Sequence, residues 1–234
     1  MIREHFAYHE TITTILGDTA EDIAAAKEAV LSARYALESY IASDPFFQLS
    51  YTPVSVPEHA PEVVLRMAEA GFEAGVGPMA AVAASLAYEG VLAMQDRGAS
   101  FGLIDNGGDI AFFSDRVLRV GIHAGKAPSS DKFAFVLPPK KSISGICTSS
   151  ATVGPSVSFG ICDAVVCFSK DPAKADAWAT SLCNQITPES FSRELPESSS
   201  LTGVYAVAGE WVGRWGELPE IVPAQVDTGL ITKG

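Results

Sequence analysis

The sequence predicts an α+β protein in which mixed or antiparallel sheets and flanking helices surround one buried helix of small residues. Three observations favour this class. Helical periodicity dominates the first hundred residues, short apolar segments between turn residues dominate the remainder, and a run of small apolar residues lies between the two. We expect a single domain, with a helix-rich lobe over about residues 1–98 and a strand-rich lobe with one helix over 99–234.

Composition and charge exclude several classes of protein. The 234 residues are 47% hydrophobic and 19% charged, which excludes a disordered chain and permits a substantial core. With 16 basic and 28 acidic residues the net charge is −12, so no nucleic-acid partner is expected. The sequence contains no secretory signal and no long uninterrupted apolar stretch, so we expect a cytoplasmic protein with no membrane partner. The four cysteines lack C-x-x-C spacing, which predicts buried, reduced thiols.

The clearest helix is predicted over residues 18–43. Apolar residues recur at steps of three and four from Ile23 to Tyr40, and Thr19 can cap the start. Asp44-Pro45 ends this helix, because proline disfavours the helical conformation in the residue before it. A second helix is predicted from Glu62 to about Ala74.

A third helix is predicted from Pro78 to Gly98. Its small side chains are apolar nearly all round, so this helix should be buried with other backbone packed closely against it. Gly75-x-Gly77-x-x-Ala80 matches a dinucleotide fingerprint in form, but a predicted helix precedes it where a strand is required. The helix start at Gly77 either presents free N–H groups to an anion or packs against neighbouring backbone.

Short apolar runs predict the strands. They cover residues 101–104, 110–113, 117–122, 133–137, 143–147, 164–168, 204–208 and 211–215, with one further helix over 172–186. The intervening Asn-Gly-Gly segment predicts that the first two strands form a hairpin.

Three segments carry candidate binding residues, and each also has a purely structural interpretation. Asn106-Gly107-Gly108-Asp109 either lets a ligand approach the backbone or forms only a turn. Residues 145–160 carry six hydroxyls, which suit phosphate or ribose oxygens or else belong to a surface loop. Asp176 and Thr180 lie one turn apart on a predicted helix. They either hold Mg²⁺ through two hard oxygens or make a helix-dipole contact beside a solvated hydroxyl.

Five motifs occur in a recognisable order over about residues 1–190. They are Gly77-Pro78-Met79-Ala80-Ala81-Val82-Ala83, Asn106-Gly107-Gly108-Asp109-Ile110, Gly145-Ile146-Cys147-Thr148-Ser149-Ser150, Ser158-Phe159-Gly160-x-x-Asp163-Ala164-Val165 and Ala175-Asp176-Ala177-x-Ala179-Thr180. Together they resemble the ApbE-like superfamily, in a branch apart from its well-known members. Those members are FAD:protein FMN transferases, which cleave FAD with the help of Mg²⁺ and attach FMN to a Thr or Ser hydroxyl of an acceptor protein.

The resemblance implies an ApbE-like fold and a set of site residues. Asp176 and Thr180 match the metal ligands, and the backbone near Gly77 matches a segment that supplies a further carbonyl ligand. The nucleotide site is matched by Gly77, Asn106, Gly107, Gly108, Asp109, Thr148 and Ser149. The implied cofactors are Mg²⁺ and a flavin, FAD or FMN.

Two departures from the family pattern concern catalysis. No lysine stands near Ala81, and Pro155 stands where relatives carry a histidine proposed as the base. Proline cannot accept a proton from an attacking hydroxyl. The catalytic residues are therefore unknown from the sequence.

Three functions stay open. The first is Mg²⁺-dependent FMN transfer to an acceptor protein, or cleavage of the FAD pyrophosphate. The second is binding of a flavin or nucleotide without catalysis, and the third is a structural or interaction role with a vestigial pocket. The C-terminal tryptophans Trp211 and Trp215 suit either a homodimer contact or an ordinary core.

Overall fold

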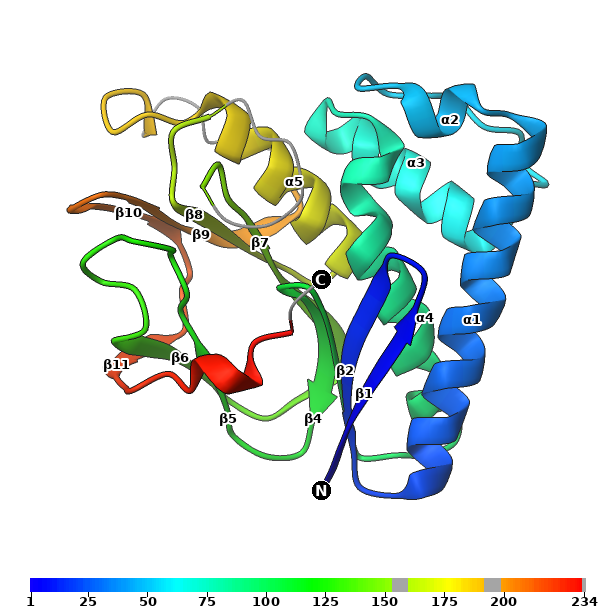
Figure 1. Cartoon of the computed structure of the whole chain (residues 1–234), viewed down its shortest axis with the longest axis horizontal. Coiled ribbons are helices and arrows are strands. Elements are labelled where there is room, and N and C mark those ends of the chain that lie inside the picture. Colours follow the sequence, from blue (N-terminus) through cyan, green and yellow to red (C-terminus); the bar gives the residue numbers. More distant parts are fainter. Residues whose placement is uncertain (153–159, 192–198, 233–234) are drawn as a thin grey trace.

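The computed structural model describes residues 1–152, 160–191 and 199–232. Over these residues an eight-stranded sheet separates two layers (Figure 1). Helices cover one face of this sheet, and a three-stranded sheet covers the other. The α+β class expected from the sequence, with antiparallel sheets and flanking helices, is confirmed.

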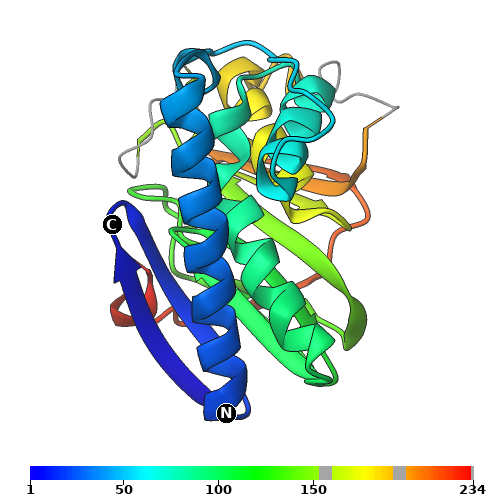
Figure 2. The same cartoon turned by 90° about the vertical axis from the view of Figure 1, so that its right-hand side faces the viewer.

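The α-helices lie on one face of the large sheet, where α1 (Ala20–Ser43) and α4 (Val82–Asp96) run side by side (Figure 2). The α-helices are α1 Ala20–Ser43, α2 Phe46–Leu49, α3 Glu62–Ala74, α4 Val82–Asp96 and α5 Pro172–Gln185, and the short 3-10 helices are η1 Pro78–Ala81 and η2 Thr228–Leu230.

Every strand pair described is antiparallel. In spatial order the large sheet contains β1 Ile2–Tyr8, β2 Thr11–Gly17, β3 Phe101–Asn106, β4 Asp109–Ser114, β7 Lys140–Ser149, β8 Ala164–Ser169, β9 Leu201–Ala208 and β10 Trp211–Gly216. The small sheet contains β11 Glu220–Pro223, β6 Phe133–Leu137 and β5 Leu118–Gly121. Because β2 pairs with β3, the large sheet includes segments from both of the expected lobes.

The third predicted helix is divided in two. Pro78 begins the short helix η1, and α4 begins only at Val82, after Ala81 leaves the helical conformation at φ −121°. The free N–H groups of the long helix therefore lie four residues later than the sequence predicts. This shift determines which residues the helix start contacts.

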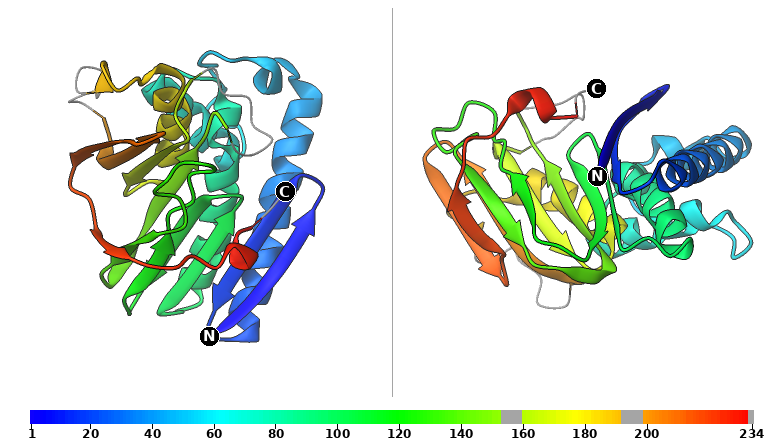
Figure 3. Two further views of the ribbon diagram at one scale, coloured as in Figure 1. Left: turned by 60° about the vertical axis from the view of Figure 1, so that its left-hand side comes forward. Right: turned by 90° about the horizontal axis from the view of Figure 1, so that it is seen from below.

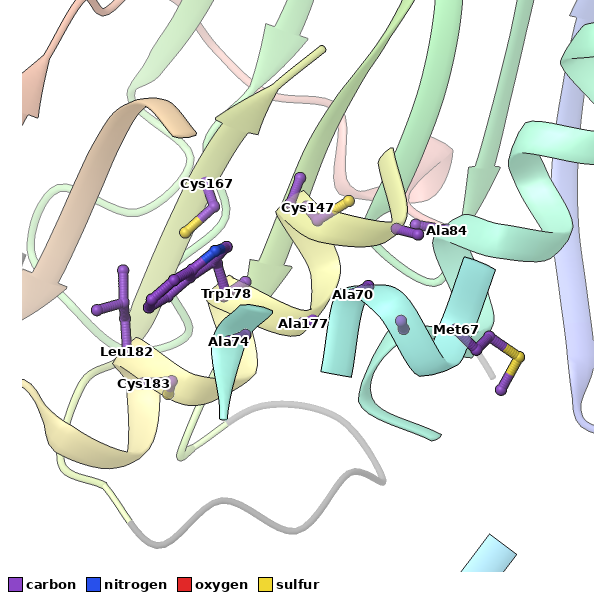
Figure 4. Packing of buried hydrophobic residues seen from close by; sticks show 14 of the residues in the cluster. Met67, Ala70, Ala74, Ala84, Cys147, Cys167, Ala177, Trp178, Leu182 and Cys183 are labelled. Atoms are coloured by element: carbon purple, nitrogen blue, oxygen red, sulfur yellow. The ribbon is translucent and has the colours of Figure 1, made fainter. Parts of the chain in front are cut away.

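The core lies on both faces of the large sheet. On the helical face, small and sulfur-containing side chains from α3, α4 and α5 pack against β7 and β8, as Figure 4 shows around Trp178 and Cys167. Between the two sheets, Phe135 makes edge-to-face contacts with Phe168 and Tyr205, at ring-centroid distances of 4.9 and 5.5 Å. Each fully buried aromatic or aliphatic side chain of this kind stabilises the fold by about 1.5–3 kcal/mol.

No single helix in the described part of the chain is long and apolar enough to cross a membrane. There, only the pair formed by α3 and η1–α4 has the required length and apolar character when its two members are taken together, and this pair is bent by 106°.

Candidate functional site

Four neighbouring strands contribute one row of side chains to the helical face of the large sheet. Asn106 of β3 pairs with Asp109 of β4, and Cys147 of β7 pairs with Cys167 of β8. The pairing of β4 with β7 places Asp109 beside Cys147. Because successive side chains alternate between the faces of a strand, all four point toward the helices.

The first turn of α4 lies over this row. The Asn106 side-chain amide donates to the Ala83 carbonyl at 3.0 Å, which fixes the helix start on β3. The Ala84 N–H donates to Asp176 Oδ2 at 3.1 Å. The anion that meets this helix N-terminus is therefore the chain's own carboxylate, carried by α5, and the helix dipole favours it there.

Asp176 and Asp109 form a pair of carboxylates, of which Asp176 is buried and Asp109 is half-buried. Asp176 is only 8% exposed, and Asp109 Oδ1 accepts the Thr148 N–H at 3.2 Å. Burial raises the pKa of Asp176 to about 7, although the Ala84 and Ala83 N–H groups oppose this shift. Burial, and then the charge of Asp176, raise the pKa of Asp109 well above its ordinary value.

The described residues provide no Lys, Arg or His ion-pair partner for either carboxylate of this pair. Near neutral pH the pair must therefore retain a proton or meet a cation from outside the chain. The same part of the chain contains no group of three or more His, Cys, Asp or Glu side chains able to hold a metal. Any metal here would depend on hydroxyl, carbonyl or ligand oxygens as well.

The other predicted residues surround this pair unequally. Thr180 lies one turn beyond Asp176 on α5 and is half-buried. Ser149 lies at the end of β7, on the same face as Cys147, by strand alternation. The Thr148 side chain points to the opposite face, because its strand partner Val166 belongs to the cluster between the sheets.

Gly107 and Gly108 form the two-residue loop of the β3–β4 hairpin. Their φ values are +69° and +105°. Glycine adopts positive φ without steric cost, and a common two-residue hairpin turn requires positive φ at both residues. A Cβ added to either would meet nothing within 4 Å, so the space beside the turn is open. The predicted hairpin is confirmed, and the turn leaves room for a ligand to approach the backbone.

Gly77 lies against another part of the backbone. A Cβ added there would lie 1.9 Å from the Ser50 carbonyl oxygen. The packing interpretation of this glycine therefore has direct structural support. The helix η1 that follows it packs against α5.

The remaining sequence features contribute little to the site. All four cysteines are buried and none is in a disulfide, as predicted, and burial raises the pKa of Cys147 and Cys167 well above the ordinary thiol value. Pro155 and most of the segment 155–160 lie outside the described residues. Hollows of about 420 and 320 Å³ lie elsewhere. The first is lined by residues 131–132 and 223–225, the second by residues 18, 19, 22 and 97–101, and no predicted site residue lines either.

Comparison with known proteins identifies relatives over the whole chain. Residues 3–207 match the family described as AbpE bacteria. Proteins named UPF0280 protein from Methanocorpusculum labreanum and Methanosphaerula palustris are 66% and 55% identical. Each match spans 100% of this chain, and the two matches span 100% and 99% of the respective relative.

Solved flavin transferases share the fold. The apo flavinyl transferase ApbE of Pseudomonas stutzeri aligns with a TM-score of 0.58 at 12% identity, over 100% of this chain and 98% of that one. The flavin transferase ApbE of Vibrio cholerae aligns with a TM-score of 0.51, also at 12% identity, over 95% and 96%. At this identity the likeness shows a common fold.

Proposed function

The chain belongs to the AbpE bacteria family, and from this premise we propose that it binds a flavin nucleotide together with Mg²⁺ at the end of the sheet where Asp109 and Asp176 meet. The single observation that carries the proposal is this pair of carboxylates, one buried and one half-buried, each held by a backbone N–H and without a cationic partner among the described residues. The flavin transferases that share the fold support flavin as the ligand class.

The donor chemistry of these residues fits a hard divalent cation. Mg²⁺ prefers oxygen ligands and usually takes one or two carboxylates, and completes its shell with water and substrate phosphate. Asp176 and Thr180 would hold it from α5, and Asp109 would face it from β4. When bound, Mg²⁺ would neutralise charge on a diphosphate.

The chain's own residues hold these groups in place. The Ala84 N–H orients the Asp176 carboxylate, and the Thr148 N–H orients that of Asp109. The Asn106 amide fixes the start of α4, so the donor at Ala84 has a defined position. Such fixed hydrogen bonds reduce the ordering that ligand binding would require.

The open space beside the Gly107–Gly108 turn suits the nucleotide. Backbone without side chains lets a phosphate or ribose approach closely. Ser149 adds a hydroxyl on the same face of the sheet as the carboxylates. Asn106, Gly107, Gly108, Asp109 and Ser149 therefore form the nucleotide side of the proposed site, and Thr148 contributes its backbone N–H.

Binding without transfer is favoured over transfer. The lysine expected near Ala81 is absent, and Pro155 replaces the residue that would act as the base. If transfer does occur, FMN is attached to a hydroxyl of an acceptor protein and AMP is released.

Titration of FAD and FMN into the purified protein, with and without Mg²⁺, tests the proposal. We expect saturable quenching of flavin fluorescence that strengthens with Mg²⁺ and is lost in Asp176→Asn. Asp96→Asn is the matched control, because it makes the same change at an exposed residue near the end of α4. Absence of saturable flavin binding by the wild type would refute the proposal, and release of AMP from FAD would establish catalysis.

A further inference from the structure

The C-terminal segment returns to the large sheet after β11. It forms η2 and comes close to β1 (red in Figure 3). The Arg3 guanidinium donates to the Leu230 carbonyl at 2.5 Å, which attaches the segment to β1. This segment lies beyond the residues that match the family, which end at 207.

Thr232 is the most buried residue of this segment, with 5% of its surface exposed. Its hydroxyl donates to Asp105 Oδ2 at 2.6 Å and lies 2.8 Å from the Thr14 hydroxyl. Thr14 in turn lies 3.0 Å from Nδ1 of His5. Thr232 therefore joins the segment to a polar network with residues of β1, β2 and β3.

Asp105 connects this network to the glycine turn. Its second oxygen, Oδ1, accepts the Gly108 N–H at 2.9 Å. Asp105 and Asn106 are consecutive residues of β3, so their side chains point to opposite faces. The Asp105 side chain fixes the turn, whereas the Asn106 side chain fixes the start of α4.

We propose that Thr232 is a positioning residue for the nucleotide site, because it orients the Asp105 carboxylate that holds the Gly107–Gly108 turn. The inference rests on the proposed function only in taking that turn as part of the nucleotide site. Glycines lose more conformational freedom on ordering than other residues, so a glycine pair needs an external restraint to keep one conformation. Asp105 supplies that restraint, and Thr232 fixes Asp105.

The substitution Thr232→Val removes the hydroxyl and keeps the side-chain shape. Hydrogen bonds to charged groups contribute enough that we expect exchange of the Gly108 amide proton to accelerate about tenfold or more. Affinity for FAD should weaken by about tenfold, because the turn must be ordered on binding. Thr232→Ser retains the hydroxyl and should restore both properties, and Thr232→Ala should behave like the valine variant.

Thr228→Val is the matched control, because Thr228 is an exposed threonine of the same segment. If Thr232→Val leaves Gly108 exchange no faster than this control does, or if Thr232→Ser fails to restore it, the proposal is overturned. Amide exchange is measured without ligand. A wild type that binds no flavin would therefore refute the proposed function, while the exchange data would still decide the role of Thr232.

Discussion

Replacement of Asp176 by asparagine should make the metal-free protein more stable at alkaline pH. Asparagine has nearly the same shape, and its side-chain oxygen can still accept the Ala84 N–H. What the substitution removes is a negative charge that is buried beside Asp109. The change therefore isolates the electrostatic cost of the pair from its packing.

The magnitude follows from the pKa of Asp176. Folding raises this pKa from an ordinary value of 3.8 to about 7, so the native state binds the proton more tightly than the unfolded state. The penalty is absent below pH 3.8, grows as the pH rises, and is complete above pH 7. A shift of this size corresponds to about 4 kcal/mol. Because the asparagine hydrogen bond is weaker than that of a carboxylate, we expect a net gain of about 2–3 kcal/mol at pH 8.

Urea unfolding in a chelator, at pH values from 4 to 8, measures this gain. The difference between wild type and Asp176→Asn should be small at pH 4 and should increase through pH 7. Asp96→Asn, at an exposed position, should show no such increase. A difference that does not change with pH would show that the Asp176 carboxylate is not destabilised by its surroundings, and the case for a cation there would fail.

Three further predictions concern the metal and the packing around the site. Mg²⁺ should raise the melting temperature of the wild type more at pH 8 than at pH 6, because the cation competes with protons for the carboxylate pair. Equal shifts in melting temperature at the two pH values would contradict this prediction. Burial would raise the pKa of Glu73, but hydrogen bonds from Ser200 and the Trp178 indole outweigh it and lower the pKa to about 2. This carboxylate therefore stabilises the fold above pH 4.5, with the effect lost as the pH falls through 2, and Glu73→Gln should lower the free energy of unfolding at pH 7 by about 2–3 kcal/mol. Gly77→Ala should cost about 1–3 kcal/mol in the same urea assay, because its Cβ would overlap the Ser50 carbonyl, and an unchanged midpoint would show that the Ser50 backbone moves freely.

The helices and the central hairpin could be predicted because their signals are local. Thr19 accepts the Asp22 N–H at 3.1 Å, as its position before the apolar pattern of α1 predicts. The Asn-Gly-Gly sequence likewise predicts the β3–β4 turn. Strand β2 gave no comparable signal, since Thr11, Thr13 and Thr14 are buried together with apolar neighbours and the expected alternation is absent. Strand β1 is an edge strand whose residues are largely exposed, so it lacks an apolar pattern.

The relation between the two carboxylates could not be predicted from spacing. Asp176 and Thr180 share a helix face, which the sequence shows, but nothing local indicates that Asp176 meets α4 and Asp109. That contact depends on the register of β3, β4 and β7 and on the position of α5 above them. The delayed start of α4 is equally non-local, because the turn of η1 displaces the free N–H groups to Ala84.

The energetic argument favours a function for the carboxylate pair over a purely structural role. Two acids that are largely withdrawn from water and repel each other destabilise a fold, and apolar or amide residues of similar size would pack at lower cost. The Ala84 and Thr148 N–H groups offset part of that cost but leave the pKa of each carboxyl raised. A divalent cation would remove the repulsion and convert a destabilising pair into a stabilising one. Mg²⁺ binding and Asp176→Asn therefore stabilise the fold in the same way, by removing the effect of the negative charge at Asp176. The Asp176→Asn variant should accordingly gain little further stability from Mg²⁺.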